Sequence, residues 1–206
     1  MTSSTCRNLV SPLAVILTAS LAVELIAGCA TPVCAEETKL LLTFSGGHET
    51  DPKDHGRPVV LVAGALGVKP EVFREAFSGV TPARDRPPTG DEARRNKEAL
   101  MKVLKPYNVT NDRLDEVSNY YRYQPQKGEM WPTTAAEGYA VIEDGKIKKI
   151  VVTKPGAGYS SPPKVTVKGF EKVPLVATVE YVKELKKNGA IKTIEIAPPE
   201  GAGSKK

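Results

Sequence analysis

The 206-residue sequence predicts an α+β fold, in which a small helical module precedes an antiparallel β-hairpin module. Three observations lead to this prediction. Residues 1–35 have the features of an export signal and stand apart from the fold. Residues 58–122 contain about four short segments with helical periodicity, and from Gly128 onward the periodicity becomes that of strands. The expected division is therefore a signal peptide at 1–35, an N-terminal strand with the helical module at 36–128, and a lysine-rich β module at 129–206.

The N-terminus predicts export. Arg7 precedes an apolar stretch from Leu9 to Val23, and mostly small residues follow as far as Ala35, as in a secretory signal peptide. The apolar stretch is shorter than the ~20 residues that a membrane-spanning helix needs. Two processing routes remain open. Cleavage after Ala35 would release a chain without cysteine, whereas the lipobox-like sequence that ends at Cys29 would make that cysteine a lipid anchor.

Both routes place the protein outside the cytoplasm. It would be periplasmic, extracellular or lipid-anchored in the envelope, and we expect membrane contact only through the signal peptide or a lipid on Cys29. Cleavage after Ala35 is the favoured route.

The helical module follows a short strand. Leu40, Leu42 and Phe44 alternate along that strand, and a polar loop then leads to Pro58. Proline suits the start of a helix, because the N–H that it lacks would have been unpaired there. The spacing of Thr89 and Glu92 predicts a capping box at the start of a third helix.

The β module begins with a predicted hairpin, whose strands Tyr139 to Ile142 and Ile147 to Thr153 are joined by Asp144-Gly145. An internal repeat relates this hairpin to a later one, since 145–152 aligns with 189–196. In both copies two isoleucines stand three residues apart and an apolar residue follows two further on, which strict alternation forbids. We therefore expect a β-bulge in each copy, near Lys148-Lys149 and Lys192-Thr193.

The segment Gly156-Ala157-Gly158-Tyr159-Ser160-Ser161-Pro162-Pro163 lies between the two copies. It resembles the Gly-x-Gly-Tyr-Ser/Thr-x-x-Pro motif of β-repeats in bacterial exoproteins and phage structural proteins. The resemblance covers roughly 139–197. It implies a structural corner, in which the glycines allow the turn, the tyrosine packs beneath it and the prolines begin the next strand.

A second resemblance covers 46–123, on the sequences Gly-Gly-His-Glu-Thr-Asp-Pro-Lys-Asp-His-Gly-Arg-Pro and Val-Thr-Asn-Asp-Arg-Leu-Asp-Glu-Val-Ser-Asn-Tyr-Tyr-Arg-Tyr. This region is similar to an uncharacterised family of exported bacterial proteins. That similarity implies export and a shared arrangement of modules, and it supplies no activity.

Both histidines of the chain lie in the polar loop with three carboxylates, and the five side chains are candidate metal ligands: His48, Glu49, Asp51, Asp54 and His55. Imidazole and carboxylate groups bind zinc and similar ions. A bound divalent metal ion could activate water for hydrolysis. The spacing matches no helical metal motif, however, so a structural role in turns and hydrogen bonds is the favoured interpretation of the loop.

A second candidate site gathers aromatic residues around one arginine, and it consists of Tyr120, Tyr121, Arg122, Tyr123 and Trp131. Aromatic faces beside a guanidinium suit stacking on sugar rings or gripping a peptide. The favoured alternative is that Tyr121 belongs to the core and that the others cover the joint between the two modules.

Charge is concentrated in the β module, where 140–206 contains 13 lysines, no arginine and seven acidic residues. Such a field could attract acidic envelope polymers, although lysines on exposed strands also prevent strands from pairing edge to edge. We expect no nucleic-acid partner, because arginine is absent where the charge lies. The sequence has no nucleophile elbow, phosphate loop or dinucleotide fingerprint.

These observations favour an exported, envelope-associated binding or structural protein without catalytic residues. Acidic or carbohydrate envelope polymers are the expected partners. The alternative is a metal-dependent hydrolase that uses the loop from His48 to His55.

Overall fold

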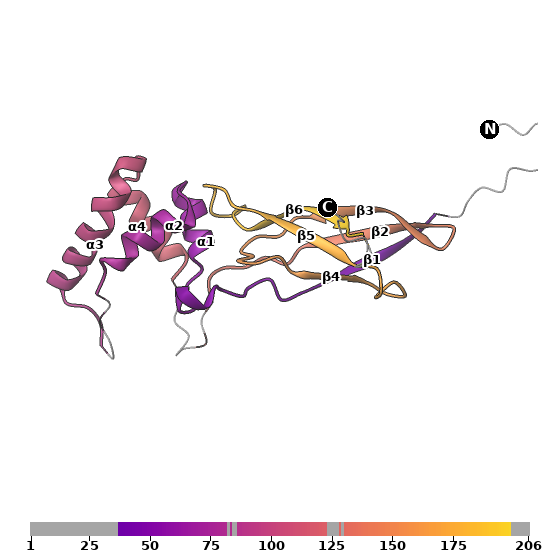
Figure 1. Ribbon diagram of the computed structural model, residues 1–206, viewed down its shortest axis with the longest axis horizontal. Helices are drawn as coiled ribbons and strands as arrows, with labels where there is room; N and C mark the ends of the chain where they lie inside the picture. Colours follow the sequence, from indigo (N-terminus) through magenta and orange to yellow (C-terminus); the bar gives the residue numbers. More distant parts are fainter. Residues whose placement is uncertain (1–36, 82, 84–85, 123–127, 129, 199–206) are drawn as a thin grey trace, which may run out of the picture. The chain divides into compact units, whose positions relative to one another are not determined.

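The computed structural model describes residues 37–81, 83, 86–122, 128 and 130–198. In these ranges one strand precedes four helices and five strands follow them (Figure 1). The elements in chain order are β1 (Thr38–Ser45), η1 (Pro52–Asp54), α1 (Val59–Leu66), α2 (Pro70–Ser78), α3 (Gly90–Leu104), η2 (Lys105–Tyr107), α4 (Asn111–Tyr120), β2 (Glu137–Glu143), β3 (Lys146–Lys154), β4 (Lys164–Val167), β5 (Leu175–Glu180) and β6 (Ala190–Ile196). The predicted α+β class is confirmed.

The described strands form one antiparallel sheet in the order β3-β2-β1-β4-β5-β6. β1 lies inside this sheet, because its first half pairs with β2 and its second half with β4. Leu40 is opposite Ala140 in the first pairing, and Phe44 is opposite Val165 in the second. The strand that the sequence grouped with the helices therefore joins the two halves of the sheet, and the helices are inserted between β1 and β2.

Both predicted bulges are present. In the first hairpin Ile147 is opposite Ile142 and Lys149 is opposite Val141, so Lys148 is the extra residue. In the second hairpin Ile191 and Thr193 pair with consecutive residues of β5, which leaves Lys192 extra. The irregularity that the repeat predicted thus occurs at equivalent positions of β3 and β6.

The sheet has its own apolar core on one face. Its buried members are Leu42, Ala136, Ala140, Ile142, Tyr159, Val165, Val167, Ala177 and Ile191. In β1 the alternation predicted from the sequence holds, since Leu42 is buried while its neighbour Leu41 is 79% exposed. The period of two therefore identifies the buried face of this strand correctly.

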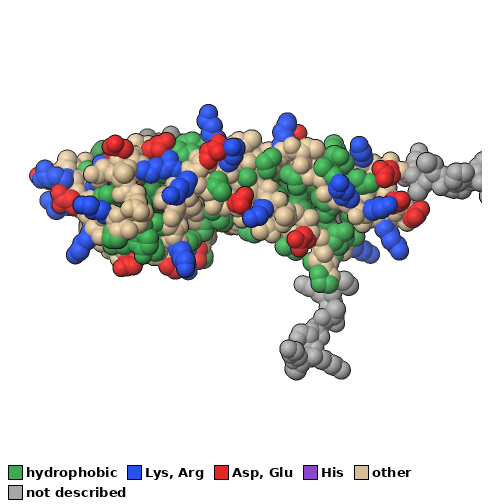
Figure 2. All heavy atoms as spheres, turned by 90° about the horizontal axis from the view of Figure 1, so that it is seen from above, with side chains coloured by type: hydrophobic (Ala, Val, Ile, Leu, Met, Phe, Trp, Pro, Cys, Tyr) green, Lys and Arg blue, Asp and Glu red, His purple; other side chains and the backbone are tan. Residues whose placement is uncertain are grey.

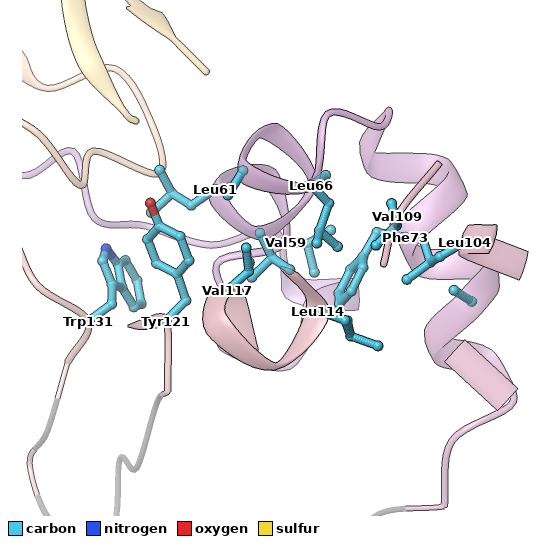
Figure 3. Packing of buried hydrophobic residues seen from close by; sticks show 14 residues of the cluster. Val59, Leu61, Leu66, Phe73, Leu104, Val109, Leu114, Val117, Tyr121 and Trp131 are labelled. Carbon is cyan, nitrogen blue, oxygen red and sulfur yellow. The ribbon is translucent and has the colours of Figure 1, made fainter. Parts of the chain in front are cut away.

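Six of the eight residues of α1 are buried. α2 and α4 pack against this helix, and α3 packs against α2. Pro58 precedes α1 as predicted, and buried side chains of α2 and α4 pack with it in one cluster (Figure 3). α3 begins with the predicted capping box, in which Thr89 Oγ1 accepts from Glu92 N at 3.3 Å and Glu92 Oε2 accepts from Thr89 N at 2.8 Å. The ion pair with Arg86 and the Thr89 N–H lower the pKa of Glu92 to about 2.

Asn188 links the helical core to the sheet. It is fully buried, and its Nδ2 donates to the backbone oxygen of Leu61 at 2.7 Å and to Tyr121 Oη at 2.9 Å. Its Oδ1 accepts from Val182 N at 2.9 Å, while its backbone oxygen accepts from Gly158 N at 2.9 Å. One side chain therefore connects α1, the end of α4 and the segment between β5 and β6. Over the described ranges no helix has the length and apolar character to cross a membrane.

Candidate functional site

The polar loop, residues 46–58, leads from β1 to α1 and lies against the corner, residues 156–163, that follows β3. The backbone oxygen of Gly47 accepts from the N–H groups of Ser160 and Ser161, at 2.9 and 3.2 Å. Ser160 Oγ donates to the backbone oxygen of Glu49 at 2.9 Å. These bonds join two segments that are more than 100 residues apart in the sequence, and they hold the first half of the loop in place.

Tyr159, within the corner, packs into the apolar core of the sheet. Its ring is 4% exposed, and its hydroxyl accepts from Ala136 N at 3.0 Å. The His48 ring stacks on it, with ring centroids 5.1 Å apart and an angle of 5° between the planes. His48 Nδ1 lies 3.3 Å from Gly158 O, to which Trp131 Nε1 also donates. His48 is therefore part of the packing between the loop and the corner.

Glu49 also stabilises the contact between the polar loop and the corner. Its carboxylate accepts from Ser161 Oγ at 2.5 Å and from Gly47 N at 2.9 Å. The Ser161 hydroxyl is the main reason why the pKa of Glu49 lies below its ordinary value. The carboxylate is thus ionised and used to close the turn.

Asp51 and Asp54 organise the second half of the loop. Asp51 accepts from Lys53 N and begins η1, and its bonds to Lys53 lower its pKa. The buried Asp54 carboxylate receives two bonds from Arg74 of α2, at 2.7 and 2.8 Å. This paired geometry raises the pKa of the Arg74 guanidinium and fastens the loop to α2.

The five candidate metal ligands do not converge. His48 stacks on Tyr159, Glu49 closes a turn, and the two aspartates pair with cations. His55 is exposed and ends η1 in the left-handed conformation, with φ of 50°. Among the described residues, which include all five, no group of three or more His, Cys, Asp or Glu side chains is arranged to hold a metal ion. The predicted metal cluster is therefore not assembled, because separate partners hold these side chains apart.

Two hollows adjoin the polar loop, with volumes of about 640 and 310 Å³. Both are bordered by Asp54, Arg57, Val59 and Arg74. We call the larger one the Arg57 hollow, and its lining consists of Lys53, Asp54, His55, Arg57, Val59, Arg74, Phe77 and Ser78. The smaller one extends toward Ser160 and Ser161 of the corner.

Arg57 is the distinctive group of this hollow. Its guanidinium carbon lies 4.4 Å from the centroid of the Phe77 ring, and its NH1 donates to the backbone oxygen of Asp54 at 3.3 Å. Lys53 pairs with Asp51 and Arg74 pairs with Asp54, whereas no described carboxylate lies within ion-pair distance of Arg57. A half-buried guanidinium held on an aromatic face, with no charged partner of its own, can bind a carboxylate, sulfate or phosphate.

The residues of the second candidate site lie in different environments. Tyr121 and Trp131 are 4% and 3% exposed and belong to the helical core (Figure 3). Tyr120 is half-buried and packs edge-on against Tyr121, with centroids 5.0 Å apart. Arg122 is exposed and donates to Asn119 Oδ1 at 3.1 Å, and Tyr123 lies outside the described residues. The described members thus do not form one exposed aromatic surface.

Tyr120 does border a separate hollow of about 740 Å³ between α4 and the segment that follows β5. Arg113 of α4 crosses this region and donates to the backbone oxygens of Ala65 and Lys183. Those bonds, together with an ion pair to Glu116, occupy the Arg113 guanidinium.

Arg74 and Phe77 were not identified from the sequence as site residues. Their three-residue spacing places them on one side of α2, but the sequence carries no signal that this side faces the polar loop. The candidate lipidation site at Cys29 and the cleavage site after Ala35 lie outside the described residues.

A scan against protein-family models found no match to the chain. Searches of the curated proteins and of the solved structures also found none.

Proposed function

We propose that this protein is an exported, envelope-associated binding protein without a catalytic role, and that the Arg57 hollow binds an acidic group of an envelope polymer. The observation that carries the proposal is the Arg57 guanidinium, which is seated on Phe77 and has no carboxylate partner among the described residues. The signal-like N-terminus supports the location, and the lysine-rich β module supports an acidic ligand.

The geometry favours an anion over a neutral ligand. Phe77 and the Asp54 carbonyl fix the guanidinium before any ligand arrives, so little side-chain freedom is lost on binding. Lys53 and His55 border the same hollow and are exposed. They can contact a second acidic group, as repeating acidic units along a polymer would present.

The lysines of the β module contribute in a different way. On the face shown in Figure 2, Lys and Arg side chains are interspersed with Asp and Glu, so the positive charge there does not form one continuous patch. The excess of lysine over acidic residues in 140–206 therefore acts as a long-range attraction that speeds encounter with a polyanion. Specific binding is assigned to the hollow.

The test is binding of polygalacturonate, a carboxylated polysaccharide, to the protein expressed with its full sequence and to Arg57→Gln, measured by isothermal titration calorimetry. Loss of one charge-assisted contact should weaken binding about tenfold. Arg122→Gln is the matched control, because Arg122 is an exposed arginine away from the hollow whose bond to Asn119 is local. Equal affinity of Arg57→Gln and Arg122→Gln for the polymer would exclude the hollow as the binding site.

A substitution at Arg57 also removes a packing contact with Phe77. Thermal unfolding of Arg57→Gln should therefore accompany the calorimetry, and Lys53→Gln provides a second variant that leaves this packing intact. Lys53 pairs with Asp51 at the surface, and its loss should weaken polymer binding with little change in melting temperature.

A further inference from the structure

The two edges of the sheet approach each other. β3 and β6 are the edge strands, and they contact each other although five other pairings separate them in the sheet (Figure 1). Just beyond the end of β3, Ile191 N donates to Pro155 O at 2.8 Å. No strand pairing between β3 and β6 continues from this bond within the described residues. The sheet therefore nearly closes on itself, and a seam remains between residues 149–152 and 192–195.

The seam is a groove of about 510 Å³ that runs between the two strands. Ile150, Val152 and Ile194 border it and pack against the core of the sheet. These three side chains are only half-buried, whereas their cross-strand neighbours Ala140 and Ala177 are buried. The apolar layer of the sheet is thus incompletely covered along the seam.

Charged side chains border the same groove on both strands. Lys149 has no carboxylate within ion-pair distance among the described residues, and the bulge residue Lys192 pairs with Glu180 at 3.1 Å. β3 carries four lysines and no acidic residue, while β6 contributes Lys192 and Glu195. Lysines on an edge strand discourage pairing with another basic or neutral strand, and a second copy of this chain would bring the same lysines.

We propose that the seam binds an extended segment of a partner protein in which apolar and acidic residues alternate. The segment adds as a strand along the free edge of β3, where main-chain hydrogen bonds supply affinity. Because successive side chains of a strand point to opposite faces, the apolar ones cover Ile150, Val152 and Ile194. The acidic ones then lie on the other face, next to Lys149 and Lys192. This surface is distinct from the Arg57 hollow, and its failure would leave the polymer-binding proposal untouched.

The test uses a fluorescent peptide of about six residues, a usual strand length, in which valine and glutamate alternate. Fluorescence anisotropy should show binding to the protein expressed with its full sequence. The variant Lys149→Glu/Lys192→Glu should bind this peptide at least about tenfold more weakly and should instead bind a peptide of alternating valine and lysine. Lys168→Glu/Lys172→Glu is the matched control, because it makes the same charge change at exposed positions that do not border the groove.

A second measurement separates strand addition from simple charge attraction. Hydrogen exchange at 149–152 should slow when the alternating peptide is bound, and a peptide with the same residues in two blocks should bind weakly. The proposal would be overturned if the blocked peptide bound as tightly as the alternating one. It would also be overturned if Lys149→Glu/Lys192→Glu and Lys168→Glu/Lys172→Glu lost the same affinity for the alternating peptide. Self-association of the protein without peptide binding would overturn it as well, since the seam would then join copies of this chain.

Discussion

Tyr121 Oη accepts a hydrogen bond from Asn188 Nδ2 at 2.9 Å in the interior of the protein. Tyr121 follows the last helix of the helical module, and Asn188 precedes the last strand of the sheet. The same Nδ2 group donates to Leu61 O and Oδ1 accepts from Val182 N, so the amide satisfies polar groups of both modules at once. A neutral amide can make these bonds without the cost of burying a charge.

Replacing Asn188 with alanine should destabilise the protein. The change leaves Val182 N, Leu61 O and Tyr121 Oη without their present partner, and each unsatisfied buried group costs free energy. We expect a loss of about 3 kcal/mol in the free energy of unfolding, measured by urea denaturation. Asn119→Ala, at an exposed asparagine, is the control. A loss below about 1 kcal/mol would show that water replaces the amide.

The same tyrosine predicts a loss of stability at alkaline pH. Burial raises the pKa of Tyr121 from 10.0 to about 12. The unfolded chain therefore releases this proton at a lower pH than the folded chain does. The contribution to stability is complete below pH 10 and is lost as the pH rises to about 12. Stability measured across this range should fall less steeply in Tyr121→Phe.

Desolvation also raises the pKa of Tyr181 to about 12, although the residue as a whole is 37% exposed. Tyr181→Phe should therefore reduce the remaining dependence of stability on pH. Lysines titrate in the same range, so the comparison is the difference between each variant and the unchanged protein. If neither variant alters the slope, the two hydroxyls ionise equally readily in the folded and unfolded chains.

Removal of one partner of the ion pair between Arg74 and Asp54 should destabilise the protein more than removal of both partners. Arg74→Met leaves the Asp54 carboxylate buried without a counter-charge. Denaturant titrations should show a loss of about 3–5 kcal/mol for this single variant and a much smaller loss for Arg74→Met/Asp54→Leu. Arg94→Met removes an exposed pair with Asp91 and should cost less than about 1 kcal/mol. The argument fails if the double variant is as unstable as Arg74→Met.

The helices, hairpins and bulges could be predicted because local patterns determine them. The capping box needs only the three-residue spacing of Thr89 and Glu92, and the bulge at Lys148 appears as a slip in the alternation of apolar residues. The position of β1 could not be predicted in this way. Its partners lie about 100 and 123 residues away, and nothing in its own seven or eight residues specifies them.

The candidate site shows the same limit. The sequence identified the polar loop, and the structure places that loop beside a hollow. The sequence did not predict that Arg74 would hold Asp54, or that Phe77 would support Arg57, because these contacts depend on how α2 packs. His48 was a reasonable metal ligand by residue type, yet its position on Tyr159 follows from a contact across 111 residues.

Gly47→Ala should disrupt the contact between the polar loop and the corner. Gly47 has φ of 87°, and a Cβ atom there would lie 2.6 Å from Tyr159 Cδ1 and 2.9 Å from Pro163 Cβ. Gly145→Ala is the matched control, because Gly145 has φ of 70° in a turn with open space around it. Backbone strain of about 1 kcal/mol is common to both variants, so a larger loss of thermal stability in Gly47→Ala measures the steric clash. Equal losses would mean that the corner yields to the methyl group, and His48 would then be free to move with it.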